Sequence, residues 1–449
     1  MGATVLWLRR DLRLADNPAL VEAARNGGGV AALFVLDDAL RRAAGPNRLA
    51  FLYRALRDLD DRMGGRLVVR SGEPAEVVPA VAAEAGAGTV VCAGDFGPYG
   101  HRRDEAVEVA LGREGRVLRR VGSPYSVDPG TVRKADGTPF RVFTPFYRAW
   151  TQRRPPAPGP VPAGVHWLPV PGEGTPPVPP TEAALPDATE AAAQARLAGF
   201  VDRDLKGYAD GRDVPGADAT SRLSAYLKYG LVHPRQVLAS LGRSQDAERF
   251  RTELAWREFY ADVLWNEPGS ARLSLQPAMR AMRSDEGAVA DRRFEAWAAG
   301  RTGYPVVDAG MRQLLAEGWM HNRVRMITAS FLVKDLHLTW QRGARHFLHH
   351  LVDGDLASNN HGWQWVAGTG TDPAPFFRVF NPVTQSRTFD PEGAYIRRYV
   401  PELAGLGARH IHEPWKLPAG LPAGYPAPIV DHKAEREEAL RRYAEVTGR

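Results

Sequence analysis

The sequence predicts an α/β domain joined by a long connector to an all-α domain. Three observations carry this prediction. Short β-branched apolar runs alternate with helix-like stretches near the N-terminus, prolines crowd the middle of the chain, and apolar residues recur every three or four positions from about residue 201 onward. We therefore expect an α/β domain at 1–130, a connector at 131–200 and a helical domain at 201–449.

Five apolar runs near the N-terminus are typical of buried strands. They lie at Thr4–Leu8, Val30–Leu36, Leu67–Val69, Thr89–Cys92 and Arg116–Val121. Helix-like stretches such as Asn47–Met63 lie between them, and this alternation is typical of a Rossmann-like parallel sheet. The triplet Gly27-Gly28-Gly29 precedes a strand instead of opening a helix, so it does not support a dinucleotide-binding phosphate loop.

The connector is predicted from its proline content. Twelve prolines lie between Pro155 and Pro186, too many for a helix or an interior strand, so this stretch should be extended. Beyond it, long helical segments are predicted at Ala247–Trp265 and Asp308–Leu338. The tail Lys433–Arg449 is typical of a charged surface helix.

Composition narrows the class of protein. With 449 residues and 44% hydrophobic content, the chain can bury the cores of two or three domains. Its single cysteine, Cys92, excludes a disulfide framework, a cysteine-rich zinc site and a four-cysteine iron–sulfur cluster within one subunit, and we expect it in the core. There is no signal-peptide core and no apolar stretch of about eighteen residues, so we expect a cytoplasmic protein.

The charge balance leaves two interpretations open. The 58 Lys and Arg residues exceed the 52 Asp and Glu residues, which suits a polyanionic partner and equally suits a merely basic enzyme. Eight of the eleven tryptophans lie after residue 250, interleaved with Arg, Asn and Asp. Aromatic faces beside cations can stack bases and hold phosphates, although a Trp-rich helical core explains most of these positions.

Two groups of polar residues lie at or within the predicted helices. Thr220-Ser221-Arg222-Leu223-Ser224 gathers hydroxyl groups just before the apolar run YLKYGLV, where a helix start can hold a phosphate or can carry an ordinary N-cap. Farther along, Glu253, Trp256, Arg257 and Tyr260 fall at i, i+3, i+4 and i+7. One helical face would therefore carry a carboxyl group, a cation and two aromatic rings, with a surface Glu–Arg pair as the alternative.

A third grouping places an amide among apolar side chains. Trp319, Asn322 and Met326 fall at i, i+3 and i+7, and a buried amide there needs either a bound polar group or a core network as its partner. The run from Asp353 to Trp365 is dense in acidic, amide and indole groups. A metal site there is a minor alternative, because two carboxylates with only a distant His make a poor ligand set.

Six segments, in their order along the chain, resemble the photolyase/cryptochrome family. They are WLRRDLRLADNPAL, TSRLSAYLKYG, ELAWREFY, GWMHNRVRM, DGDLASNNHGWQW and GTGTDPAPFFRVFNP. The similarity spans nearly the whole chain and is closest to the bacterial class I cyclobutane pyrimidine dimer photolyases. It implies an α/β domain for a light-harvesting chromophore, a long connector, and a helical domain that buries FAD.

The resemblance also assigns the FAD contacts. Those to the phosphates and the ribityl chain are Tyr208, Thr220, Ser221, Leu223 and Ser224. Arg325 and Asp353 resemble the salt-bridged pair beside the flavin ring, and Asp355 resembles a ring contact. Asn359 resembles the amide that faces flavin N5, where an uncharged group adds no negative charge beside the reduced flavin.

Electron transfer to the flavin is implied at two indoles. Trp363 and Trp340 resemble the inner two members of the family's tryptophan chain. The outer member is missing, because no indole stands near Arg283 or Gly287.

The resemblance assigns the substrate contacts as well. Trp256 and Trp365 resemble the indoles that line the dimer pocket, Met326 fills space against the cyclobutane ring, and Asn322 offers hydrogen bonds. Glu253 resembles the carboxylic acid that hydrogen-bonds the damaged thymine and is expected to be a protonated donor. The contacts to phosphates beside the lesion are Arg212, Arg257, Arg323 and Arg378.

The implied activity is light-driven repair of cyclobutane pyrimidine dimers in DNA. Excited FADH⁻ would pass one electron to a flipped-out dimer, whose two ring bonds then split. The alternative within the family is a cryptochrome photoreceptor or a (6-4) photolyase, whose pocket typically has histidines where this chain has Asn322 and Met326. A non-enzymatic FAD or nucleotide-binding module is the alternative from another class. We expect a monomer that binds DNA with little sequence preference.

A second chromophore is expected in the α/β domain. GDFGPYGHRRD (94–104) and GPNRLAFL (45–52) partly resemble a deazaflavin-type pocket, with Gly97 where an acidic residue is common. We favour 8-hydroxy-deazaflavin over methenyltetrahydrofolate.

Overall fold

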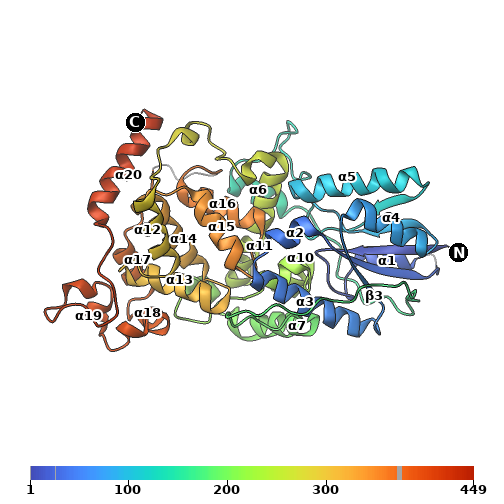
Figure 1. The fold of residues 1–449 in the computed structure, drawn as a ribbon, viewed down its shortest axis with the longest axis horizontal. Helices are drawn as coiled ribbons and strands as arrows, with labels where there is room; N and C mark the ends of the chain where they lie inside the picture. The colour runs from blue at the N-terminus through green and yellow to red at the C-terminus, as the bar shows by residue number, and fades with distance from the viewer. Residues whose placement is uncertain (1, 26, 372–376, 449) are drawn as a thin grey trace. The chain divides into compact units, whose positions relative to one another are not determined.

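The structure is a computed structural model that describes residues 2–25, 27–371 and 377–448 (Figure 1). Contacts within the chain divide it into two compact units. The first unit contains Met1–Thr181, Pro186–Lys206 and Ser221–Pro268, and the second contains Glu182–Leu185, Gly207–Thr220 and Gly269–Arg449. The units follow contacts and not chain order, so the domain boundaries expected near residues 130 and 200 stay a prediction.

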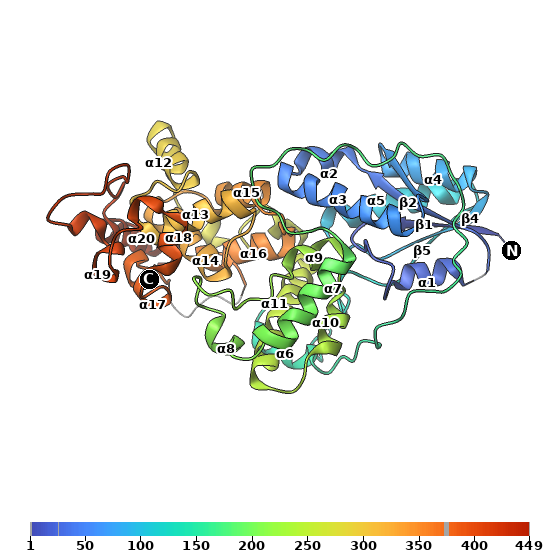
Figure 2. The ribbon, with the colours of Figure 1, turned by 90° about the horizontal axis from the view of Figure 1, so that it is seen from below.

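The first unit is built on a five-stranded parallel sheet with the order β3-β2-β1-β4-β5 (Figures 1 and 2). The strands are β1 (Ala3–Leu8), β2 (Val30–Leu36), β3 (Leu67–Ser71), β4 (Ala87–Cys92) and β5 (Val117–Arg120). All five predicted runs are strands, and the Rossmann-like α/β expectation is confirmed. Every residue of β2 is buried, because helices cover both faces of such a sheet. Cys92 is fully buried at the end of β4, as expected.

Helices of the first unit follow the strands. They are α1 (Pro18–Ala24), α2 (Asp38–Ala43), α3 (Pro46–Arg62), α4 (Pro74–Glu84), α5 (Pro98–Arg113), α6 (Phe143–Trp150), α7 (Glu190–Gly199), the π-helix η1 (Phe200–Asp204), α9 (Ser224–Tyr229), α10 (Pro234–Ser240) and α11 (Gln245–Asn266). Val78 of α4 and Val107 of α5 pack with Val5 and Trp7 of β1 in one buried cluster. The predicted helices at 47–63 and 247–265 are α3 and α11.

The proline-rich stretch 155–186 is extended, as predicted, while the wider range 131–200 expected for the connector also contains α6 and α7. It forms no helix between α6 and α7, and it lies along the sheet of the first unit. Val30 N donates to His166 O at 2.8 Å, and Leu168 N returns a bond to Val30 O at 2.9 Å. Prolines cannot donate such bonds, so the connector contacts the sheet at Leu168 and at the neighbouring Trp167, whose backbone forms a parallel bridge to Val30.

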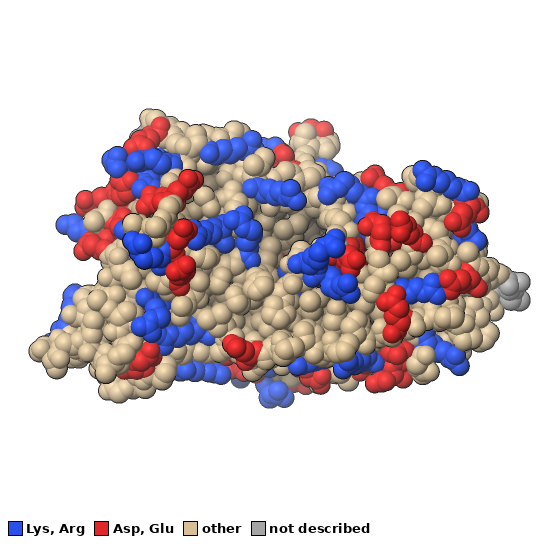
Figure 3. All heavy atoms as spheres, viewed as in Figure 1, with Lys and Arg blue, Asp and Glu red and all other residues tan. Residues whose placement is uncertain are grey.

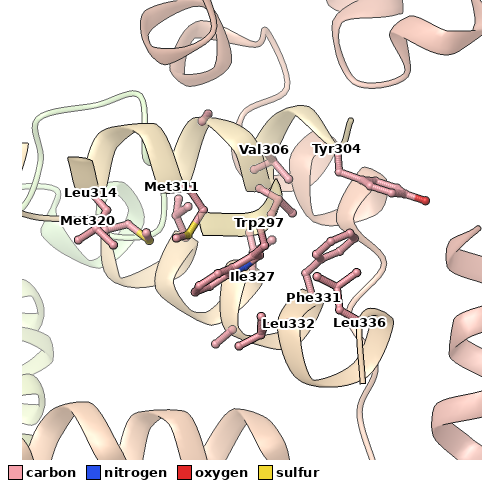
Figure 4. Close-up of a cluster of buried hydrophobic side chains, with 14 of the residues drawn as sticks. Trp297, Tyr304, Val306, Met311, Leu314, Met320, Ile327, Phe331, Leu332 and Leu336 are labelled. Atoms are coloured by element: carbon pink, nitrogen blue, oxygen red, sulfur yellow. The ribbon is translucent and has the colours of Figure 1, made fainter. Parts of the chain in front are cut away.

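The second unit is helical in its described residues. Its elements are α8 (Tyr208–Gly211), α12 (Ala288–Ala298), α13 (Pro305–Glu317), α14 (Asn322–Ser330), the π-helix η4 (Phe331–Asp335), α15 (Trp340–His350), α16 (Leu356–Ala367), α17 (Pro382–Phe389), α18 (Ala394–Tyr399), α19 (Ala408–Ile411) and α20 (His432–Thr447), with short 3-10 turns η2 (Pro268–Ala271), η3 (Ala278–Ala281), η5 (Pro401–Leu403) and η6 (Pro414–Lys416). Figure 4 shows part of its core, where Trp297, Ile327 and Phe331 meet. No helix among the described residues is long and apolar enough to span a bilayer.

One predicted helix is wrong as a single element. The pattern at 308–338 is divided into α13, α14 and η4. Gly318 ends α13 in the left-handed conformation, with φ of 60°, and its N–H bonds back to Leu314 O. The apolar period continues across this turn, so the pattern alone does not reveal the break.

Candidate functional site

A buried ion pair joins two helical segments of the second unit. Arg325 of α14 contacts Asp353, which lies just before α16, with Nη2 and Oδ2 at 2.8 Å. Arg325 Nε also donates to Met320 O at 2.8 Å, which fixes the guanidinium plane. The Asp353 side chain is 2% exposed, and its other oxygen, Oδ1, is buried without a partner among the described residues. A buried acceptor without a donor is costly, so this atom fits a bound group that presents an N–H.

An amide oxygen lies one turn into α16. Asp355 is the N-cap of this helix, because its Oδ1 accepts from Ser358 N at 3.1 Å. Asn359 donates from Nδ2 to Ala344 O at 3.1 Å and to Asn360 Oδ1 at 2.9 Å. Both amide hydrogens are therefore used inside the protein, which leaves Oδ1 of Asn359 as the atom that can accept from a ligand.

A second polar side chain of α16, that of His361, is buried and uncharged. His361, two residues after Asn359, is 1% exposed and contacts Ala357 O at 2.7 Å and Ser270 Oγ at 3.0 Å. Burial lowers the pKa of His361 to about 4, so its imidazole is uncharged at neutral pH. Gln364 donates to Ser270 O at 2.8 Å and ties the same helix to the neighbouring loop.

The two indoles expected to transfer electrons lie on adjacent helices of the second unit. Trp363 is 3% exposed on α16, and its ring meets that of Phe347 of α15 edge-on at 4.9 Å. Gly343 allows this approach, since a Cβ there would stand 2.1 Å from the Trp363 ring. Trp340 begins α15, is 4% exposed, and donates from Nε1 to Ser274 Oγ at 3.1 Å.

Trp297 is a further indole beside Trp363 that the sequence analysis did not assign. Their ring centroids are 6.1 Å apart, and Trp297 donates from Nε1 to Thr328 O at 3.0 Å. No spacing in the sequence relates residues 297 and 363, so only the packing of α12 and α16 reveals the contact.

The hydroxyl-rich segment before α9 does not cap that helix. Leu223 occupies the N-cap position without a side-chain bond, and Ser224 is the first helical residue. Ser221 Oγ accepts instead from Leu223 N at 3.4 Å, and Arg222 has a φ of 53°. The ordinary N-cap interpretation is therefore wrong, because a left-handed residue turns the chain before the helix begins. Tyr208 and Thr220 belong to the second unit, and Tyr208 is 5% exposed at the start of α8.

The aromatic face of α11 is a stacked cluster in the first unit. The Trp256 ring lies 3.7 Å from the ring of Phe143 with an interplanar angle of 7°, and Tyr260 packs at 5.4 Å. The Glu253 side chain is 26% exposed and lies 3.8 Å from the guanidinium of Arg249. The helix therefore carries a Glu–Arg pair, but the arginine is Arg249 and not the Arg257 that the spacing suggested.

The amide of Asn322 is exposed, so the expectation of a buried amide is wrong. Asn322 is the first residue of α14, so its side chain lies at the end of the helix. Trp319 stands in the turn before the helix, so it does not share a helical face with Met326. Met326 and Trp365 are partly buried against the core of the second unit.

The four arginines expected to contact phosphates differ in their surroundings. Arg257 donates to Pro124 O at 3.1 Å and Leu227 O at 3.4 Å within the first unit. In the second unit, Arg323 pairs with Asp213 at 3.0 Å, and Arg212 directly precedes this aspartate. The Arg323–Asp213 contact leaves no signal in the sequence.

Arg378, the fourth arginine, is exposed at the end of the GTGTDPAPFFRVFNP motif. Residues 372–376 of that motif lie outside the described part of the structure. Basic and acidic side chains are interspersed over the face drawn in Figure 3.

Paired charges lie at the carboxyl ends of the strands in the first unit. Arg103 contacts Asp95 at 3.1 Å, and the Tyr99 hydroxyl donates to Asp37 at 2.6 Å. Burial acts to raise the pKa of Asp95, but Arg103 and other arginines lower it below its ordinary value, so it is ionised. Arg48, in the GPNRLAFL segment, has its Nε buried without a partner among the described residues. Such a donor fits an acceptor atom of a bound chromophore.

Comparisons with known proteins agree with this architecture. Residues 4–163 match the family described as DNA photolyase, and residues 250–445 match the FAD binding domain of DNA photolyase. The deoxyribodipyrimidine photo-lyase of Streptomyces griseus is 44% identical, over 96% of this chain and 97% of the relative. A class III photolyase from Agrobacterium tumefaciens has a TM-score of 0.94 at 38% identity, covering 100% of this chain and 98% of that one. A cryptochrome from Synechocystis has a TM-score of 0.91 at 28% identity, covering 98% and 99%.

The fold and the helical domain thus define a flavoprotein of the photolyase/cryptochrome class. Within that class, the matched segments and the full-length identity are decisive. The chain belongs to the DNA photolyase family, and residues 250–445 are its FAD binding domain.

Proposed function

We propose that this protein is a deoxyribodipyrimidine photo-lyase that uses light to repair cyclobutane pyrimidine dimers in DNA. The observation that carries the proposal is the Arg325–Asp353 pair with its unpartnered oxygen, close in sequence to the neutral acceptor of Asn359. When bound, reduced FAD supplies the light-excited electron donor. The relatives that carry this enzyme name and match over the full length support the substrate class.

The chain's own residues bind and orient the cofactor. We assign the phosphates and ribityl chain to Tyr208, Thr220, Ser221, Leu223 and Ser224, as in the family. Asp353 Oδ1 would accept an N–H of the ring system, Arg325 would hold that carboxylate in place through their ion pair, and Asp355 would add a ring contact. Asn359 accepts through Oδ1 without adding charge, because its two hydrogens are used by Ala344 and Asn360.

The substrate contacts are assigned residue by residue from the family resemblance, with Glu253, Trp256 and Arg257 in the first unit and the others in the second. Trp256 and Trp365 stack against the extruded dimer, Met326 packs on the cyclobutane ring, and Asn322 donates hydrogen bonds from its exposed position. Glu253 interacts with the damaged thymine. Arg212, Arg257, Arg323 and Arg378 are assigned to phosphates beside the lesion. The guanidinium of Arg257 also donates to two backbone carbonyls of the first unit.

The test is repair of a thymine-dimer oligonucleotide by purified, reduced protein, with matched dark and illuminated samples. We expect restoration only in the light. Glu253→Ala should lower repair. Glu253→Gln keeps a donor and an acceptor but cannot carry a charge, so it should retain more repair than Glu253→Ala if an uncharged hydrogen-bonding group suffices. Light-independent or absent restoration by flavin-loaded protein would refute the proposal.

The second candidate is a cryptochrome photoreceptor or a (6-4) photolyase. The observation in its favour is the similarity to the Synechocystis cryptochrome fold. Asn322 and Met326 stand where that alternative typically has histidines, which favours dimer repair. Cleavage of a (6-4) photoproduct instead of a dimer in the same assay would select the alternative, and a flavin-loaded protein without either activity would select the photoreceptor.

A second chromophore, 8-hydroxy-deazaflavin in preference to methenyltetrahydrofolate, is proposed for the first unit. The buried Nε of Arg48 supports a bound acceptor there. Protein from a deazaflavin-producing host should carry the chromophore, and Arg48→Met should lose it while keeping FAD. The monomeric state and cytoplasmic location stay predictions.

A further inference from the structure

The short segment 377–380 carries Arg378 but has no helix or strand of its own. Two side chains from the neighbouring helical elements contact its backbone. Ser330 Oγ accepts from Phe380 N at 3.4 Å, and Lys334 Nζ donates to Arg378 O. Arg378 is exposed, but its carbonyl is held by Lys334. The held backbone therefore fixes the position on the protein surface from which the Arg378 side chain extends.

Lys334 lies in an unusual place for a lysine. Its side chain is buried, with 3% of the residue exposed, and its ammonium lies 4.4 Å from the centre of the Phe377 ring. The Phe377 ring also stacks on the ring of Tyr443, with the centroids 4.3 Å apart. Lys334 and Asp335 are consecutive residues of the π-helix η4, which ends with Leu336 N bonded to Phe331 O at 3.0 Å, so their side chains point in different directions. Asp335 contacts His432 Nδ1 of α20, so Lys334 donates to a backbone carbonyl and not to this carboxylate.

Burying a lysine is expensive, and an apolar side chain of similar length would fill the same space. The structural alternative is that Lys334 serves only the core. That alternative does not explain why the acceptor of the buried ammonium is the carbonyl of an arginine with an exposed side chain.

We propose that Lys334 is a positioning residue for DNA binding, which holds the backbone of Arg378 so that its guanidinium meets a phosphate beside the lesion. This inference rests on the proposed function and on the assignment of Arg378. Lys334 touches neither DNA nor flavin and acts through residue 378.

Titration supports the geometry. Burial lowers the pKa of Lys334 to about 7, with Asp335 raising it and Arg378 lowering it as the charged groups that face it. The ammonium form, which donates most strongly, is therefore lost as pH rises through neutrality. DNA affinity of the wild-type protein should fall over that range, whereas a variant without the Arg378 side chain should lack this part of the dependence.

The experiment measures Kd of the FAD-loaded protein for a duplex with one thymine dimer, over a series of salt concentrations. Arg378→Ala should weaken binding and lower the slope of log Kd against log salt by about one. Lys334→Met should weaken binding in the same direction, and the double variant should be no weaker than Arg378→Ala alone. FAD content and the wavelength-dependent photoreduction should stay at the wild-type level.

Each failure has its own signature. If the wild-type protein does not prefer dimer-containing DNA, the proposed function fails. If Arg378→Ala weakens binding but Lys334→Met does not, or if the two effects add fully in the double variant, the positioning role of Lys334 is refuted. Should Lys334→Met not fold, the wild-type and Arg378→Ala proteins are compared between pH 6 and 8.5, and parallel pH profiles would overturn the inference.

Discussion

Asp353→Asn tests whether the buried carboxylate holds the flavin. The substitution keeps the size of the side chain and removes the charge that Arg325 Nη2 contacts at 2.8 Å. Because the Asp353 side chain is 2% exposed, the lost charge-assisted hydrogen bond should lower the free energy of unfolding by about 1.5–3 kcal/mol. The asparagine also replaces one of two acceptors by a donor, so a ligand N–H would meet an N–H. FAD affinity should therefore fall in addition to stability.

Two measurements separate these effects. Urea denaturation of the apoprotein gives the change in stability, and titration of the apoprotein with FAD gives Kd. Asp390→Asn is the matched control, because Asp390 is also buried and accepts from Tyr395 N and Ile396 N, each at 3.0 Å. The control should lose stability and keep its FAD affinity. If Asp353→Asn binds FAD with the wild-type Kd, and Asp390→Asn behaves as expected, the assignment of Asp353 to the flavin is refuted.

Three further predictions follow from packing and charge. Trp363→Phe should block photoreduction of oxidised flavin while sparing repair by chemically pre-reduced enzyme, and equal loss of both would contradict the separate roles. Gly343→Ala should lower the free energy of unfolding, measured by thermal melts, by about 1–3 kcal/mol, since the new methyl group would stand 2.1 Å from the Trp363 ring. Gly362→Ala is the control: its methyl group would have nothing within 4 Å, so the substitution should be neutral or stabilising. Burial lowers the pKa of Lys334 from its ordinary value of 10.5 to about 7, so between these values the unfolded chain binds more protons than the folded one. Wild-type stability relative to Lys334→Met should therefore rise as pH increases from about 7 to 10. Denaturation midpoints that run parallel across that range would show that Lys334 does not titrate there.

The strands were predictable because each is a short apolar run with a clear end. Val30–Leu36 is buried at every position, which is what an uninterrupted apolar run indicates in a parallel sheet. The helix break at Gly318 was not predictable from periodicity, because the apolar spacing on its two sides stays in phase. The glycine itself was the available signal, since glycine is common in the left-handed position that ends a helix.

The site was predictable only as far as motifs reach. Arg325 and Asp353 were paired through the family resemblance, and the structure contains that ion pair. The partners of Arg257 and Arg323 were not predictable, because a carbonyl of residue 124 and the carboxylate of Asp213 are brought near by tertiary packing. The exposure of Asn322 follows from where α14 begins, and helix ends are the least reliable feature of a sequence pattern.

The stacking of Phe143 on Trp256 has a consequence for how DNA damage is approached. One face of the indole is covered by a nearly parallel ring, with the ring centroids 3.7 Å apart, so a nucleobase cannot stack on that face. A side chain covered in this way cannot act as a wedge between two stacked base pairs, which requires two open faces. It can only receive a base that has already left the duplex. On the proposed assignment of Trp256 to the dimer, the weakened stacking of the damaged step itself would supply the opening, and intact DNA, which does not open so easily, would engage this indole less.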